Sequence, residues 1–200
     1  MASSPLFLDI ETDGLDPTTI WMVVTRQDGQ SQVHYSADTL SDALQGDFSV
    51  IGHNLIGFDL PVLKRLWGLS VASERIQDTL VLSRLANPAR EGGHRLANWG
   101  SILGYPKGDH SDWSCYSKEM EEYCIRDVEV TEKAYNKLRI DLLKFSKQSI
   151  ELEHQVQCVI QQQIRNGWLL DMRHATDLLA TLKERQIALE DEVQEVFKPK

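Results

Sequence analysis

The chain has 200 residues, of which 42% are hydrophobic and 26% are charged. This composition is typical of a folded globular protein and excludes disordered and collagen-like classes. No run of about 18 apolar residues occurs, which excludes a membrane-spanning class. The 21 basic and 30 acidic residues give a net charge of −9, which argues against a protein that holds nucleic acid mainly through a basic surface. Met1–Pro5 has no secretion-signal pattern and the three cysteines form no C-x-x-C pair, so we expect a cytoplasmic protein with reduced thiols.

The first hundred residues are expected to alternate between strands and helices. The turn-forming sequence DGLDP at 13–17 predicts a hairpin between the first two strands. Apolar runs and helical spacing predict strands over Leu6–Ile10, Ile20–Thr25, Gln32–Tyr35 and Ser49–Gly52, and helices over Asp38–Gln45, Asp59–Trp67, Thr79–Ala86 and Leu96–Leu103.

The second half is predicted to be helical. One helix is expected over Ser117–Phe145, another from about Gln148, and a third from Asp171 to about Phe197, after a break at Asn166-Gly167. Strands interspersed with helices, followed by helices alone, indicate an α/β fold in which helices pack on a mixed β-sheet.

Asp9 and Glu11 stand at the end of the first predicted strand. Residues i and i+2 of a strand point to the same face, so the two carboxylates should lie together. Such a pair repels and is costly to bury unless a cation compensates it, and hard cations such as Mg²⁺ or Mn²⁺ prefer carboxylate oxygens. A strand that simply runs out into solvent would explain the same residues.

Two further patterns are weak when each is taken alone. Asp59 begins a predicted helix after the turn Gly52–Phe58, where an acid can be an ordinary N-cap. Tyr123 and Asp127 are four residues apart, on one face of a predicted helix, and could be exposed side chains of a charged surface.

Taken together, these residues resemble the four-acid pattern of the DEDD 3′–5′ exonucleases. The motifs are DIETDGLD from Asp9, HNLIGFD from His53 and YCIRD from Tyr123, and they are similar to the proofreading domain of family A (polymerase I type) DNA polymerases. The subclass indicated is the one with tyrosine, because the histidine subclass would need His where this chain has Glu122. The resemblance implies an α/β, ribonuclease H-like mixed sheet flanked by helices.

The resemblance also implies a two-metal hydrolysis with Mg²⁺ or Mn²⁺ that releases nucleoside 5′-monophosphates from single-stranded or frayed DNA 3′ ends. In the family, the position of Asp9 serves both metals, those of Glu11 and Asp127 complete the site that generates hydroxide, and that of Asp59 serves the second metal. Tyr123 matches the tyrosine that orients the attacking water. A phenol with a pKa near 10 keeps its proton at neutral pH and is not a strong base there, so we expect metal activation to dominate.

Further segments resemble the replicative polymerases of T-seven-type bacteriophages. They lie at 77–85, 96–107 and 166–171, so the likeness covers nearly the whole chain. It implies an exonuclease domain over 1–146 and, over 147–200, the start of a polymerase thumb that is truncated or encoded by a split gene. We therefore expect no polymerase activity from this chain alone, and a polymerase domain, in the same full-length chain or a separate subunit, as its partner.

Three residues match positions that contact the terminal nucleotides of the DNA strand, namely Leu15, Asn54 and Phe58. Ordinary packing is an equally good interpretation of Leu15 and Phe58. His53 adjoins Asn54 and could line the site. We expect the other histidines to lie at the surface, and the cysteines to be packing residues: His34, His94, His110, His154 and His174, and Cys115, Cys124 and Cys158.

Two other functions remain open at this point. The four acids do not distinguish DNA from RNA, so an exoribonuclease of the RNase D kind is an alternative. A catalytically silent exonuclease fold that serves as an interaction module is another, although all four acids and the tyrosine are present.

The last predicted helix carries an apolar seam whose members alternate four and three residues apart, interrupted by Gln186. This narrow seam suits one facing helix better than packing on the chain's own core, and the resemblance implies that this partner is the second long helix of a polymerase thumb, which we expect this chain to lack. We therefore expect the seam either to pair with the same helix of a second molecule, so that the chain self-associates, or to be left mobile. The seam consists of Ala175, Leu179, Leu182, Gln186, Leu189, Val193 and Val196.

Overall fold

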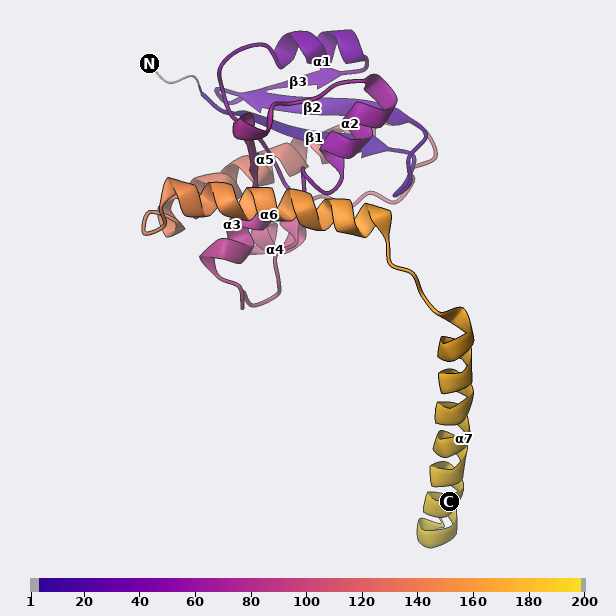
Figure 1. Ribbon diagram of the computed structural model, residues 1–200. Coiled ribbons are helices and arrows are strands. Elements are labelled where there is room, and N and C mark those ends of the chain that lie inside the picture. The colour runs from indigo at the N-terminus through magenta and orange to yellow at the C-terminus, as the bar shows by residue number, and fades with distance from the viewer. Residues whose placement is uncertain (1–3, 199–200) are drawn as a thin grey trace. The chain divides into compact units, whose positions relative to one another are not determined.

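The computed structural model describes residues 4–198 (Figure 1). The strands are β1 (Leu6–Thr12), β2 (Ile20–Gln27), β3 (Gln30–His34), β4 (Val50–Gly52) and β5 (Ile76–Asp78). The helices are α1 (Ala37–Ala43), α2 (Asp59–Trp67), α3 (Thr79–Ala86), α4 (Leu96–Ile102), α5 (Lys118–Asp141), α6 (Lys147–Asn166) and α7 (Met172–Phe197), with a 3₁₀ turn η1 (Ser73–Arg75). None of the helices described is long and apolar enough to cross a membrane.

The chain divides into two compact units between Gln162 and Gln163, in the last turns of α6. The first unit holds the sheet, α1–α5 and most of α6, and the second holds the end of α6 and α7. The resemblance implies a domain boundary between residues 146 and 147. This boundary stays a prediction, because a division into compact units does not test where an exonuclease domain ends.

The sheet has the strand order β3-β2-β1-β4-β5 and is mixed, as expected. β1 pairs antiparallel with β2, from Phe7 opposite Arg26 to Thr12 opposite Ile20, so the predicted hairpin is confirmed. β4 runs parallel to β1 and to β5. The strand β5 was not expected from the sequence, because three residues are too few to show an alternating pattern.

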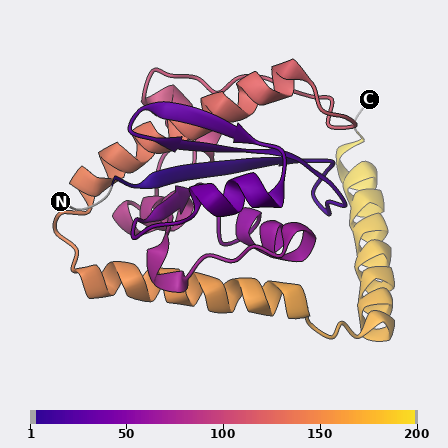
Figure 2. The same cartoon turned by 90° about the horizontal axis from the view of Figure 1, so that it is seen from above.

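Alternation along β1 directs its side chains into two different layers. Leu6, Leu8 and Ile10 join the apolar cluster that contains residues of α1 and α2. Phe7 joins the opposite cluster, which is built largely from α4 and α5. Figure 2 shows these helices on the two sides of the sheet. Since side chains two residues apart share a face, Asp9 and Glu11 lie on the side of Phe7 and face α5.

Local signals explain the helix ends. Gly68 ends α2 in the left-handed conformation, with a φ of 70°, which glycine adopts without steric cost. Asp78 caps α3 by accepting from the Leu80 N–H, and Asp171 caps α7 by accepting from the His174 N–H. The helix expected over Ser117–Phe145 ends earlier, at Asp141.

Two histidines contradict the expectation that they lie at the surface. His34 is fully buried, with Nε2 2.7 Å from the Thr25 hydroxyl. His154 is buried on α6, although that helix leaves apolar residues such as Leu152 and Ile164 exposed. The buried face of α6 is thus partly polar, which apolar periodicity could not reveal.

We expect Gly52→Ala to destabilise the protein by about 1–3 kcal/mol, because overpacking a close backbone approach forces neighbours to move. A methyl group here would lie 2.9 Å from the backbone oxygen of Leu8 and 2.8 Å from the Leu55 side chain. Urea unfolding measures the effect. Gly108→Ala is the matched control, since its methyl would meet only the Tyr123 ring, at 3.5 Å. Equal stability of the two variants would contradict this account of Gly52.

Candidate active site

Three of the four acids, Asp9, Glu11 and Asp127, meet where β1 faces α5. Glu11 and Asp127 are buried, and Asp9 is partly buried between them and the core. Cys124, one turn before Asp127, points its thiol at Asp9, with Sγ 3.6 Å from Oδ2 and 3.7 Å from the backbone oxygen. Side chains two residues apart on β1 share one face, and side chains about one turn apart on α5 share another, and these two faces meet here.

Asp59 joins this cluster from the other side of β1. It is the first residue of α2, but the N-cap is Phe58, which makes no side-chain capping bond. The Asp59 side chain is 4% exposed and accepts a hydrogen bond from the backbone of Ile10. The interpretation of Asp59 as an ordinary N-cap is therefore wrong: its carboxylate is turned into the protein, toward Asp9.

Lys107 also belongs to the site, although the sequence motifs give it no role there. Its Nζ lies 2.6 Å from Asp127 Oδ2 and 4.6 Å from the centre of the Tyr123 ring. Lys107 lies in the loop between α4 and α5, so its sequence position gives no sign that it faces Asp127. The surface interpretation of Tyr123 and Asp127 is thus replaced by a buried acid that pairs with a partly buried lysine, with a half-buried phenol beside it.

Burial raises the pKa of every carboxyl in the cluster, and repulsion from neighbouring acids adds to this effect at Asp9, Glu11 and Asp59. Burial and the neighbouring Asp127 raise the pKa of Asp9 to about 8. Burial, Asp9 and Asp127 raise that of Glu11 to about 9, and burial and Asp9 hold the pKa of Asp59 well above its ordinary value. Burial raises the pKa of Asp127 to about 6, against the opposing effect of Lys107. One lysine is therefore insufficient to neutralise four acids.

The donor atoms fit a divalent cation. Ligand atoms of Asp9, Glu11 and Cys124 lie within 4.8 Å of one another. Asp127 Oδ1 is buried and has no hydrogen-bond partner among the described residues, whereas buried polar atoms are normally paired. Burial and the acids raise the pKa of the Cys124 thiol well above its usual range, so the sulfur stays protonated and the donor atoms that the cluster offers are carboxylate oxygens. Oxygen donors suit Mg²⁺ or Mn²⁺.

The loop that precedes Asp59 is held by Asp78. The Asp78 carboxylate accepts from the backbone N–H groups of Asn54 and Ile56, at 2.9 and 3.0 Å, as well as from Leu80. Asn54 adopts a left-handed φ of 63°, which costs energy unless such bonds stabilise it. His154 completes this support, because its Nε2 accepts the backbone N–H of Asp78 at 2.9 Å.

Three residues of this loop, His53, Asn54 and Phe58, are all partly exposed. Asn54 and Phe58 are partly exposed, so both side chains reach the surface near Asp59. The His53 ring is tied to Thr79, with Nδ1 2.8 Å from the hydroxyl oxygen. Burial and the nearby Lys107 lower the pKa of His53 to about 4, so this ring is neutral.

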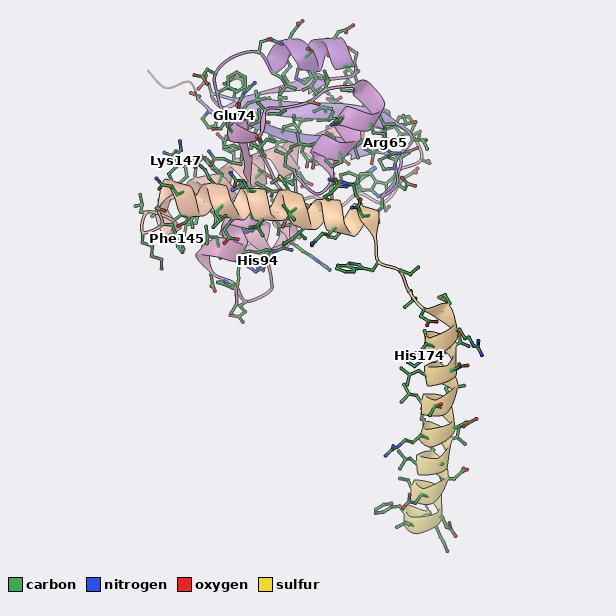
Figure 3. The ribbon with its side chains drawn as sticks, viewed as in Figure 1. Arg65, Glu74, His94, Phe145, Lys147 and His174 are labelled. Carbon is green, nitrogen blue, oxygen red and sulfur yellow. The ribbon has the colours of Figure 1, made fainter. Side chains whose placement is uncertain are left out.

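Leu15 is 94% exposed at the tip of the loop between β1 and β2, so it is not a core residue. The loop is nevertheless well tied. Asp13 accepts from the backbone N–H groups of Thr18 and Thr19, and Arg65 of α2, labelled in Figure 3, donates to the backbone oxygen of Pro17 at 2.6 Å. A large apolar side chain is thus presented to solvent on an ordered support.

We expect Asp78→Asn to lower the free energy of unfolding by about 1–3 kcal/mol, because its amide nitrogen would face backbone donors and leave one without an acceptor. Urea unfolding measures the loss, and the amide hydrogens of Asn54 and Ile56 should exchange faster. Asp47→Asn, an exposed carboxylate, is the matched control. Unchanged protection of both amides would contradict the role given to Asp78.

In the presence of a chelator, we expect stability to fall as the pH rises from about 4 to about 9. The unfolded chain ionises Asp9 and Glu11 near pH 4, whereas the folded state keeps these protons up to about pH 8 and 9. The folded state thus binds more protons over this window, and stability falls with pH. Urea unfolding at several pH values tests this. Asp9→Asn should show a shallower fall, and an equal slope would contradict the assignment.

No protein-family model matches this chain. The chain is 26% identical, over an alignment of 218 residues, to the DNA-directed DNA polymerase of Escherichia phage T7, and equally to that of Enterobacteria phage T3. Each match covers 78% of this chain and 31% of the polymerase, so the chain spans about a third of the length of these relatives.

The fold is also found in solved structures. Brucella melitensis NrnC with bound Mg²⁺ superimposes with a TM-score of 0.66 and 23% sequence identity, over 85% of this chain and 90% of that chain. Identity at this level shows the fold alone, whereas the polymerase matches show common descent. The chain is therefore a homologue of the T7 and T3 phage DNA polymerases over 78% of its length, and it has the ribonuclease H-like fold of the DEDD exonucleases.

Proposed function

We propose that this chain is a 3′–5′ exodeoxyribonuclease that depends on Mg²⁺ or Mn²⁺ and belongs to the tyrosine subclass. It releases nucleoside 5′-monophosphates from single-stranded or frayed DNA 3′ ends. The observation that carries the proposal is the convergence of Asp9, Glu11, Asp59 and Asp127 in a cluster that its own lysine does not neutralise. Homology to two phage DNA polymerases supports DNA as the substrate.

The carboxylates would hold two divalent cations. Asp9 would contact both, Glu11 and Asp127 would complete one site, and Asp59 would serve the other. When bound, such cations neutralise the phosphate and lower the pKa of an attacking water. The unpaired Oδ1 of Asp127 and the raised pKa values of the acids fit this role, because both conditions are relieved by a cation.

Tyr123 would orient the attacking water and not deprotonate it. Burial raises the pKa of its phenol further above the ordinary value near 10, so the hydroxyl keeps its proton at neutral pH. Lys107 holds the Asp127 carboxylate and places a fixed positive charge beside Tyr123. These two residues would therefore position groups around the scissile phosphate.

Three exposed or partly exposed groups would receive the end of the strand. Leu15 would pack against a terminal base, and Asn54 and Phe58 would hold the last nucleotides. Apolar and aromatic contacts with unstacked bases tolerate any sequence, which suits an enzyme that removes every nucleotide. Mispaired ends cost less to unstack, so strand fraying would select them.

The proposed setting is proofreading for a phage DNA polymerase in the cytoplasm of the bacterial host. The polymerase domain would lie in the same full-length chain or in a separate subunit. This part of the proposal rests on the polymerase relatives, of which the chain spans 31%.

Cleavage of end-labelled single-stranded DNA and of RNA of the same sequence, with Mg²⁺, Mn²⁺ or a chelator, tests the function. We expect 5′-labelled DNA to shorten stepwise with either metal and to stay intact with the chelator. Preferred cleavage of RNA would favour the exoribonuclease alternative, and no cleavage of either would favour a silent interaction module.

We expect Asp9→Ala to lower the rate by at least about a thousandfold, because it removes charge stabilisation in the transition state. Tyr123→Phe should cost about ten- to a hundredfold, since it removes an orienting hydroxyl and no metal ligand. Asp47→Ala is the control for a lost surface carboxylate. An Asp9→Ala protein that cleaves at the wild-type rate would refute the site.

A further inference from the structure

Helix α7 carries an apolar seam that nothing in its own unit covers. Every described residue of α7 is exposed except Ala175, which is partly buried (Figure 3, where His174 marks its first turn). The large seam residues Leu179, Leu182, Leu189 and Val193 are each about half exposed. A single amphipathic helix gains little from propensity alone, so its stability depends on what covers this face.

The seam fits a two-stranded coiled coil. Its members occupy alternating a and d positions, and six of the seven are apolar. The exception, Gln186, donates from Nε2 to Glu190 Oε1 at 2.8 Å, so its amide has a partner on its own helix when the seam is covered. The seam runs from Ala175 to Val196, which is about 32 Å at about 1.5 Å per residue.

Charges beside the seam are divided by sign along the helix. Lys183 and Arg185 flank its first half, and Glu190 and Glu192 flank its second half. Among the described residues, no ion pair is recorded for Lys183, Arg185 or Glu192. A helix with basic flanks before acidic flanks is complementary to a second copy that runs in the opposite direction.

We propose that α7 pairs with α7 of a second copy as an antiparallel coiled coil in which Gln186 of each lies beside Leu189 of the other. Arg185 then faces Glu192 of the second copy, and Lys183 faces Glu190 of the second copy. Two-fold symmetry repeats both contacts, so four pairs of opposite charge flank the seam. This association goes beyond the proposed nuclease function and does not depend on it.

Repulsion between like charges also disfavours the registers shifted by one heptad. A shift by one heptad in one direction brings Arg185 opposite Arg185 and Lys183 opposite Lys183. A shift in the other direction brings Glu190 opposite Glu190 and Glu192 opposite Glu192. A parallel pair would match only Arg185 with Glu190, twice by symmetry, and would leave Lys183 beside Leu178 and Glu192 beside Phe197. The antiparallel register therefore has the largest number of attractive contacts, and like charges oppose its one-heptad shifts.

Analytical ultracentrifugation of the full chain over a range of concentrations tests the association. We expect a dimer that dissociates on dilution and that Leu182→Asn converts to a monomer. Ala188→Asn, on the outer face of the same helix, should leave the dimer intact. Circular dichroism checks that each variant keeps its helices. A chain that stays monomeric, or a dimer that Leu182→Asn leaves unchanged, would overturn the proposal.

Charge exchange tests the direction of the helices. We expect Arg185→Glu to raise the dissociation constant about tenfold, since it replaces attraction by repulsion in two symmetric contacts. Adding Glu192→Arg should restore dimerisation to nearly the original strength, because it recreates the antiparallel pair. Adding Glu190→Arg instead should weaken the dimer further. Rescue by Glu190→Arg, with none by Glu192→Arg, would show a parallel pair and refute the register.

Discussion

The alternation of β1 is the constraint on which the candidate site depends. A single strand places Leu6, Leu8 and Ile10 in one apolar layer and directs Phe7, Asp9 and Glu11 toward the other. Moving the strand by one residue would bury both carboxylates under α1 and α2 and expose the apolar side chains to the acids of α5. The pairing register of β1 with β2 therefore decides both which side chains lie in the core and which lie in the acidic cluster.

This arrangement leaves the folded protein with a local electrostatic cost. Buried carboxylates with raised pKa values favour the protonated state. Lys107 pairs with Asp127 and also lowers the pKa values of Asp9 and Glu11, but burial and repulsion outweigh this effect at both. Such a cluster is unfavourable for stability and is maintained by the packing around it, chiefly the contact of α5 with β1. A divalent cation would offset the repulsion between the carboxylates, so the clustering that is unfavourable for stability is also the feature that suits a metal site.

The support of the cluster is also polar. Asp78 satisfies two backbone donors of the loop before Asp59, and His154 satisfies the backbone of Asp78 in turn. This chain of bonds links α6 to the strained conformation at Asn54, although none of these residues is a candidate metal ligand. Buried polar networks of this kind rigidify a structure only when every member has its partner.

The sequence by itself determined the elements and the acids, since both depend on short-range spacing. The hairpin, the long helices and the cap at Asp171 follow from apolar periodicity and turn or capping residues. The set of Asp9, Glu11, Asp59 and Asp127 follows from the resemblance of three short motifs to a known family. Only the tertiary structure decided that Lys107 pairs with Asp127, that Cys124 points at Asp9, that β5 extends the sheet, and that His34 and His154 are buried. The physical reason is that these contacts join residues from different elements. Their energy comes from burial and complementary geometry, which no local period in the sequence records.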